Sequence, residues 1–221
     1  LNAACSGFLF AYNTAQAYIT SGIYRTILVI GSESLSRIVD WTDRGTCILF
    51  GDGAGAVLLQ AKEGKSYQPV SHSDGRGGPA LTGPGVHGRV RSIDRDQGET
   101  KTEYITMNGK DVFQFAVRKV PQVIQEVIEL NTLSLEDVDW FVLHQANARI
   151  VDAVARRLHL EIDKFPMNLQ EYGNTSSASI PILLNELNKK GILKKGQRLV
   201  LAGFGAGLSW GASVLDWDLE R

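Results

Sequence analysis

Apolar residues recur along this chain in two alternating patterns, and their alternation predicts a layered α/β fold. A helix is predicted from Ser6 to about Gly22, because apolar residues recur there at steps of three and four: Phe8, Tyr12, Ala15 and Ile19. The continuous apolar run "TILVIG" at 26–31 follows it. Such a run is typical of a strand in a sheet that is buried on both faces.

The rest of the chain repeats these two patterns. Further strands are predicted at 47–50, 54–60, 140–144, 199–202 and 212–216. Further helices are predicted from Gly109 onward, over 148–158 and over 177–188. Pro121 lies inside the first of these helices, where its missing N–H group and its ring cost ~3 kcal/mol if nothing compensates. A kink or a break is therefore expected at Pro121.

The chain also contains an internal echo. The order helix, strand, glycine-rich turn, strand occurs in "CSGFLFAYNTAQAYITSG", "RTILVIG", "GDGAGAVLLQ" and again in "NTSSASIPILLNELNKKG", "QRLVLAG", "GFGAGLSWGASVLDW". We expect two similar halves, with 1–62 as the remainder of the first and 105–221 as the second. Residues 63–104, rich in glycine, proline and charge, are expected to form a connecting loop region. The second copy is preceded by a strand and helix that the first lacks, so we expect the chain to be a fragment.

Composition narrows the class of protein. The 221 residues are 43% hydrophobic and 21% charged, as in a soluble globular protein with a sizeable core. A net charge of −1 gives no global argument for binding nucleic acid or an anionic membrane. Residues 1–24 carry no charged side chain, but they are too polar to span a bilayer and lack the basic segment of a signal peptide. We therefore expect no membrane segment.

Cysteine and histidine usage argues against disulfides and metal. Two cysteines, Cys5 and Cys47, are too few for a disulfide framework and fit a reduced, cytoplasmic setting. Cys47 is interpreted as a core residue of an apolar strand. No zinc site is expected, because His72, His87 and His159 lack ligand spacing with the cysteines. The runs "GDGAGA" and "GFGAGLSWG" are weak dinucleotide signals, because each leads into a strand and not into a helix.

Three positions carry candidate chemistry. Cys5 lies at a helix start, where unpaired N–H groups and the helix dipole favour a thiolate and lower the pKa. His144 closes the strand "WFVLH", at the sheet edge where α/β folds place catalytic groups. Asn174, in "YGNTSSAS", precedes a helix as Cys5 does in the other half. Each residue also has a purely structural interpretation: Cys5 as a small buried thiol, His144 as a core histidine and Asn174 as a helix N-cap. Their matching positions at strand ends and helix starts favour a shared site.

The order Cys, His, Asn also occurs in papain-like cysteine proteases. The local signature of that family around its cysteine is absent here, and the apolar strands suit an α/β sheet better. We therefore favour a different enzyme class.

Five motifs in order resemble the β-ketoacyl-acyl carrier protein synthase III family, the initiating condensing enzymes of the thiolase-like group: "NAACSGF", "DRGTCILFGDGAGAVLL", "FVLHQANARI", "YGNTSSASIP" and "GFGAGLSWGAS". The resemblance runs from Leu1 to Trp217. It implies a thiolase-like α/β fold of two pseudo-symmetric halves in five layers (α-β-α-β-α), and a homodimer. It also implies that a companion N-terminal segment of the same protein, holding part of the coenzyme A site, is absent from this chain.

The resemblance implies a decarboxylative condensation of a starter acyl-CoA, acetyl-CoA in the simplest case, with malonyl-acyl carrier protein. Cys5 would be the nucleophile. The backbone N–H groups of Cys5 and Ala206 would bind the oxyanion, and His144 and Asn174 would bind the malonyl thioester carbonyl. Relatives commonly have glycine at the Ala206 position. The reaction needs no cofactor, because acyl-CoA is a substrate.

Binding residues are implied by the same resemblance. Those for coenzyme A and substrate are Arg44, Met107, Gly109, Phe113, Asn147 and Phe204. A stripe on one helix, Arg149, Arg156 and Arg157, would dock the acidic carrier protein, although a solvated helix face explains it equally well. Two alternatives stay open: a thiolase-like synthase for longer or branched starters, and an inactive fragment that only docks carrier protein.

Overall fold

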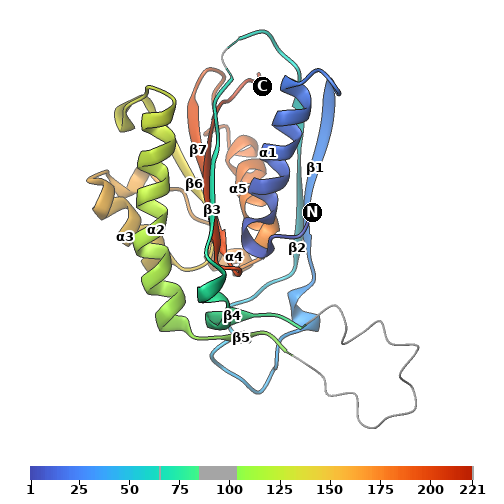
Figure 1. Ribbon diagram of the computed structural model, residues 1–221, viewed down its shortest axis with the longest axis vertical. Helices are drawn as coiled ribbons and strands as arrows, with labels where there is room; N and C mark the ends of the chain where they lie inside the picture. Colours follow the sequence, from blue (N-terminus) through green and yellow to red (C-terminus); the bar gives the residue numbers. More distant parts are fainter. Residues whose placement is uncertain (65, 85–103, 221) are drawn as a thin grey trace.

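Two β-sheets and the helices that pack on them make up most of the structure, a computed structural model that describes residues 1–64, 66–84 and 104–220 (Figure 1). The strands are β1 (Thr26–Glu33), β2 (Gly53–Gln60), β3 (Val70–Ser73), β4 (Leu81–Thr82), β5 (Thr106–Met107), β6 (Trp140–Leu143), β7 (Arg198–Gly205) and β8 (Ser209–Asp216). The helices are α1 (Gly7–Thr20), α2 (Gly109–Leu130), α3 (Ala148–Leu158), α4 (Leu169–Tyr172) and α5 (Ser179–Lys189). Short 3₁₀ helices include η1 (Ala4–Ser6), η3 (Gly75–Ala80) and η7 (Ser176–Ala178).

The larger of the two sheets is mixed. β1 and β2 form an antiparallel pair, and the larger sheet has the order β3-β8-β7-β6, in which only β6 and β7 run parallel. A small antiparallel pair, β4 and β5, lies apart from both. The predicted echo has the same topology in each copy, because α1 leads into the β1–β2 pair and α5 leads into the β7–β8 pair.

Four layers are visible in Figure 1, from the α2–α3 pair through the large sheet and the α1–α5 pair to β1–β2. The central helices are covered on both sides: Phe8 of α1 and Leu183 of α5 share one apolar cluster with Val29 of β1 and Leu201 of β7. All four side chains are buried, and each contributes about 1.5–3 kcal/mol of transfer free energy. A second cluster joins α2 and α3 to the opposite face of the large sheet.

The outer face of the β1–β2 pair is bare in the part of the chain that the structure describes. Leu28 and Ile30 of β1 are 57% and 59% exposed, and Leu58 of β2 is 60% exposed. The prediction that "TILVIG" is a strand is confirmed, but the prediction that both faces are covered is wrong for the described residues. α1 and α5 cover one face only.

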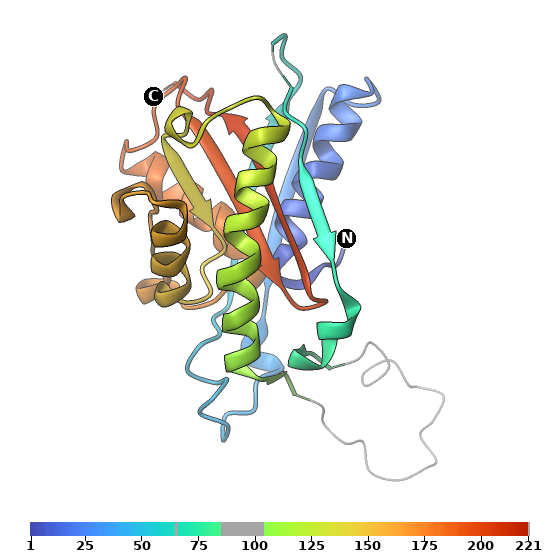
Figure 2. The ribbon, with the colours of Figure 1, turned by 60° about the vertical axis from the view of Figure 1, so that its left-hand side comes forward.

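Other expectations need correction. Residues 47–50 form turns and a single parallel bridge from Phe50 to Asn174 instead of a strand, and Cys47 is only partly buried. α2 continues through Pro121 without interruption (Figure 2). Pro121 is itself buried among the apolar side chains of α2, and that packing compensates for its missing hydrogen bond. Residues 70–82, expected to be loop, form β3, η3 and β4, because β3 completes the edge of the large sheet against β8.

Candidate active site

Four segments that are far apart in the sequence meet at one end of the fold: η1 before α1, the carboxyl end of β6, η7 before α5, and the turn between β7 and β8. The side chain of Ser6 donates a hydrogen bond of 3.1 Å to the backbone oxygen of Ser209. A Cβ atom at Gly7 would lie 3.5 Å from that of Ser177. These contacts bring the N-terminus of α1 against both the β7–β8 turn and η7.

Cys5 is buried in η1, with 6% of its surface exposed. Gly205 packs directly against it: a Cβ atom there would lie 2.6 Å from the Cβ of Cys5 and 3.0 Å from its Sγ. The backbone N–H groups of Cys5 and Ala206 and the hydroxyl of Ser176 all act on the sulfur and lower its pKa. A thioester carbonyl bound at this sulfur would therefore meet backbone donors.

The prediction that Cys5 has a lowered pKa is wrong. Burial outweighs the donors around the sulfur and raises its pKa from 9.0 to about 11, and the charge of Glu33 acts in the same direction. Cys5 is therefore a thiol at neutral pH. The positive end of the helix dipole does not offset the loss of solvent around the sulfur.

His144 follows β6 directly and is 1% exposed. Its Nδ1 lies 2.7 Å from the Oγ of Ser179, and its ring packs edge-to-face against Phe204 with centroids 5.2 Å apart. Burial lowers the pKa of the ring to about 3, although the Ser176 carbonyl acts in the opposite direction. The imidazole is neutral at physiological pH. The family resemblance implies that Phe204 contacts substrate; in the structure it packs against His144.

Asn174 is held at both its backbone and its side chain. Its backbone N–H donates to Leu49 and its backbone oxygen accepts from Gly51, around the bridge to Phe50. Its Oδ1 accepts a hydrogen bond of 2.9 Å from the backbone N–H of Ser176. Since the amide oxygen is occupied, the Nδ2 group is the part of the side chain left to donate to a ligand.

Sequence reasoning missed the supporting residues of this site. Glu33, at the end of β1, accepts hydrogen bonds from the hydroxyl and the backbone N–H of Ser177, at 2.5 and 3.2 Å, and so fixes η7. Ser176 adopts a left-handed backbone with φ of 48°. The only available signal was the cluster of hydroxyl residues in "NTSSAS", which is also an ordinary helix start.

The residues implied to bind coenzyme A lie on several elements. Met107 ends β5, and its Cε is 3.9 Å from a Cβ built at Gly109, the first residue of α2. Phe113 is partly buried against the α2–α3 core. Asn147 is the N-cap of α3, where its Oδ1 accepts from the N–H of Arg149 at 2.9 Å, and Arg44 lies in an exposed turn. Met107 and Gly109 are neighbours, whereas Asn147 and Arg44 lie on other segments of the described chain.

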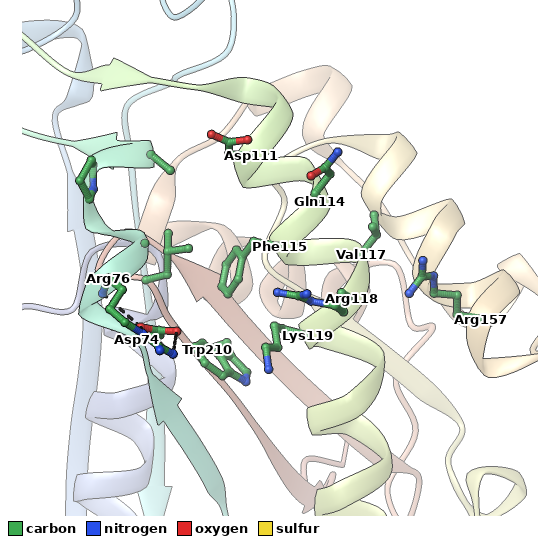
Figure 3. Close-up of a pocket in the computed structure, with 14 residues that line it drawn as sticks. Asp74, Arg76, Asp111, Gln114, Phe115, Val117, Arg118, Lys119, Arg157 and Trp210 are labelled. Atoms are coloured by element: carbon green, nitrogen blue, oxygen red, sulfur yellow. Dashed lines mark hydrogen bonds and ion pairs between the residues drawn. The ribbon is translucent and has the colours of Figure 1, made fainter.

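The arginine stripe on α3 is exposed at all three positions, Arg149, Arg156 and Arg157. Arg157 also borders a cavity of about 620 Å³ between α2, η3 and β8 (Figure 3). Arg118 and Lys119 of α2 line the same cavity, with Lys119 Nζ 5.2 Å from the Trp210 ring centroid. None of the three candidate catalytic residues lines this cavity, so it is a separate hollow beside the stripe, lined by the cations named above and Arg76 and by the carboxylates of Asp74 and Asp111.

Within 1–64, 66–84 and 104–220, no helix is long and apolar enough to cross a membrane. The same residues contain no cluster of three or more histidine, cysteine, aspartate or glutamate side chains that could hold a metal ion. His87 lies outside the described residues.

Comparisons with known proteins identify the family. A family model described as 3-oxoacyl-[acyl-carrier-protein (ACP)] synthase III matches residues 1–75, and the model of its C-terminal part matches residues 128–217. The β-ketoacyl-[acyl-carrier-protein] synthase III of Clostridium acetobutylicum is 49% identical over 98% of this chain and 66% of its own length. The synthase III of Trichodesmium erythraeum is 46% identical, over 99% of this chain and 67% of its own length.

Solved structures of the same family share the fold of this chain. The crystal structure of 3-oxoacyl-[acyl-carrier-protein] synthase III from Aquifex aeolicus has a TM-score of 0.87 and 40% identity, over 98% of this chain and 66% of that chain. The fold is thus the thiolase-like α/β fold that the motifs predict. This chain spans about two thirds of the length of these relatives. It belongs to the 3-oxoacyl-[acyl-carrier-protein] synthase III family.

Proposed function

We propose that the protein to which this chain belongs condenses a starter acyl-CoA, acetyl-CoA in the simplest case, with malonyl-acyl carrier protein and so initiates fatty acid synthesis. One observation carries the proposal. A buried thiol, a buried neutral imidazole and an amide whose oxygen is already bonded meet at one end of the fold: Cys5, His144 and Asn174. That set supplies one nucleophile and two neutral hydrogen-bond donors.

The first step is acyl transfer. The sulfur of Cys5 attacks the thioester carbon of acyl-CoA, the bond from that carbon to the coenzyme A sulfur breaks, and the thiol proton passes to the departing thiolate. The backbone N–H groups of Cys5 and Ala206 bind the oxygen while it carries negative charge. One such donor is commonly worth ~2.7–4 kcal/mol. Ala206 serves as well as glycine here, because the contribution is its N–H group and not its side chain.

The second step is decarboxylation and condensation. Nε2–H of His144 and Nδ2–H of Asn174 donate to the thioester carbonyl of the malonyl group. As the bond to the carboxylate breaks and carbon dioxide leaves, these donors stabilise the enolate. The enolate carbon then attacks the acyl carbon on Cys5, and the Cys5 thiolate departs and takes up a proton. Both donors are neutral, so neither loses a proton to the enolate.

A companion N-terminal segment of the same protein completes the fold in this account. The bare β1–β2 face supports that view, because Leu28, Ile30 and Leu58 present apolar surface that a single domain does not normally leave open. The corresponding pair in the second half, β7–β8, is covered on its outer face by α2. We further propose that the intact protein is a cytoplasmic homodimer, which rests on the family alone.

Arg149, Arg156 and Arg157 form the surface that we propose for the acidic carrier protein. None of the three makes an ion pair with any residue in the described part of the chain, so their charge is available to a partner. Arg118 and Lys119, which line the neighbouring cavity, add two further cations close to Arg157 (Figure 3). Docking of this kind weakens as the salt concentration rises.

The test of the proposed function is an assay of the intact protein with malonyl-acyl carrier protein and a series of acyl-CoA starters of increasing length and branching. The expected result is release of carbon dioxide and formation of β-ketoacyl-carrier protein, fastest with acetyl-CoA. A preference for long or branched starters would favour the broader thiolase-like alternative. Binding of carrier protein without carbon dioxide release would leave only the docking role.

A further inference from the structure

Ser176, the first residue of η7, is linked to all three candidate catalytic residues. Its backbone N–H donates to Oδ1 of Asn174 at 2.9 Å, and its hydroxyl interacts with the sulfur of Cys5. Its backbone oxygen accepts from the hydroxyl of Ser179 at 2.8 Å, and that hydroxyl oxygen lies 2.7 Å from Nδ1 of His144. Ser176 is 4% exposed, so water does not substitute for these contacts. A shift of this one residue would therefore disturb the nucleophile and both donors.

The backbone of Ser176 is in a conformation that serine does not favour. Its φ is 48°, in the left-handed region, where the Cβ of an L-residue crowds the next carbonyl oxygen. The directions of its N–H and carbonyl groups, which reach Asn174 and Ser179, both depend on this conformation. A strained backbone of this kind persists only where its surroundings hold it.

Strand β1 supplies that hold through Ser177, the next residue of η7. The carboxylate Oε1 of Glu33, the last residue of β1, accepts from the hydroxyl of Ser177 at 2.5 Å and from its backbone N–H at 3.2 Å. Hydrogen bonds to a carboxylate are stronger than those between neutral groups. Gly31 packs on the same residue, because a Cβ there would lie 2.5 Å from the backbone oxygen of Ser177. Ser177 is thus held at its hydroxyl, its N–H and its carbonyl, directly after Ser176.

The negative charge of Glu33 does not itself assist the nucleophile. Burial is the main cause of the raised pKa of Cys5, and the charge of Glu33 raises that pKa further. The carboxylate therefore opposes formation of the thiolate. Its favourable contribution to the site comes through the two hydrogen bonds to Ser177.

We propose that Glu33 is a positioning residue of the condensation site: by holding Ser177, it keeps Ser176 in the left-handed conformation that serves the nucleophile and both donors. This role rests on the proposed function. Because Ser176 is linked to residues of both steps, loss of Glu33 should slow acyl transfer and decarboxylation together.

The test compares Glu33→Ala with Glu33→Gln in the intact protein, assayed for acetylation of Cys5 and for carbon dioxide release. Glu33→Ala removes the acceptor, and the rate constants of both steps should fall about 10- to 100-fold, the usual effect of displacing reacting groups by about an ångström. Glu33→Gln removes the charge but keeps an oxygen that can accept both bonds from Ser177, so it should keep most of the wild-type rate. KM for malonyl-carrier protein should not change, because the proposed docking arginines lie on α3.

Asp137→Ala is the matched control. Oδ2 of Asp137 accepts from the backbone N–H and the hydroxyl of Ser134, at 2.8 and 3.0 Å, which are the same two kinds of bond that Glu33 makes. They lie at η5 (Leu135–Asp137), before β6, whereas His144 follows the other end of that strand. Asp137→Ala should keep the wild-type rates of both steps.

A crystal structure of Glu33→Ala gives a readout that does not depend on activity. We expect Ser176 to leave the left-handed region and Oδ1 of Asn174 to lose its backbone donor. Ser177→Ala loses only the hydroxyl bond to Glu33, so it should slow both steps less than Glu33→Ala and provides the test if Glu33→Ala does not fold.

Three results would overturn the proposal: wild-type rates in Glu33→Ala or, if that variant does not fold, in Ser177→Ala; an equal loss in Glu33→Gln and Glu33→Ala; or a left-handed Ser176 in the Glu33→Ala structure. Absence of carbon dioxide release by wild type would instead refute the proposed function. The crystal structure would then still decide whether Glu33 holds Ser176.

Discussion

A Cβ atom at Gly205 would lie 2.6 Å from the Cβ of Cys5, closer than two such atoms ever approach. Gly205 is the last residue of β7, and Phe204 beside it packs on His144. One strand end therefore sets the positions of both the sulfur and the imidazole. The close approach of backbone to sulfur is what brings the N–H of Ala206 within reach of Cys5.

Gly205→Ala should therefore displace Cys5. The extra methyl group must push η1 away from β7, which costs about 1–3 kcal/mol of unfolding free energy and takes the sulfur away from its backbone donors. Urea unfolding and the rate of Cys5 acetylation would both report the change. Gly75→Ala is the matched control, because a Cβ there meets nothing within 4 Å. Wild-type acetylation in Gly205→Ala would show that the sulfur position is not set by β7.

Alkylation of Cys5 should follow the titration of a buried thiol. Because its pKa is raised to about 11, the thiolate fraction and hence the rate with iodoacetamide should rise about tenfold per pH unit from pH 7 to 10. Peptide mapping separates the Cys5 product from that of Cys47. A rate that levels off near pH 8 would mean that the sulfur is activated in the resting site and that burial does not dominate its pKa.

Asn174→Ala should impair decarboxylation and leave acyl transfer to Cys5 intact. Its amide donates to the malonyl carbonyl and not to the acyl-CoA, so the variant should still acetylate Cys5. Carbon dioxide release should fall by about 10²–10³, the usual effect of removing one oxyanion donor. The backbone bonds that Asn174 makes to Leu49 and Gly51 are kept in the variant. Loss of acetylation in this variant would show that Asn174 also acts in the acyl-transfer step.

His144 should make the folded state sensitive to acid. Its pKa is about 3 in the folded chain and near 6.5 when unfolded, so the unfolded state binds the proton first as the pH falls. The free energy of unfolding is therefore unaffected by His144 above about pH 6.5 and falls between there and pH 3, by on the order of 5 kcal/mol in total. Urea unfolding of wild type and of His144→Gln across this range measures the effect. Parallel pH profiles for the two proteins would contradict it.

The periodicity of apolar residues predicts most of the regular helices and strands. It does not predict segments whose conformation depends on contacts with distant parts of the sequence. The α3 pattern of buried and exposed positions predicts its bounds, 148–158, because the whole signal is local. The turn at 47–50 looks like a strand from its apolar letters, but its conformation depends on the bridge to Asn174, which lies far away in the sequence. Likewise β3 is too short and too polar to predict without its partner β8.

The three candidate catalytic residues could be predicted because each lies at the start or end of a regular element. Their protonation could not. The raised pKa of Cys5 and the lowered pKa of His144 both come from burial by elements remote in the sequence. The contact of Ser179 with His144 requires α5 to lie beside the end of β6, and that of Ser177 with Glu33 requires η7 to lie beside β1. No local pattern reveals either arrangement.

The most direct test of the central claim, that Cys5 is the nucleophile of a condensing enzyme, is intact-mass and peptide-mapping mass spectrometry of the protein after incubation with acetyl-CoA. We expect an acetyl increment on the peptide that contains Cys5, its loss in Cys5→Ala, and its removal when malonyl-carrier protein is added. An acetyl group on Cys47, or an increment that persists in Cys5→Ala, would show that Cys5 is not the nucleophile.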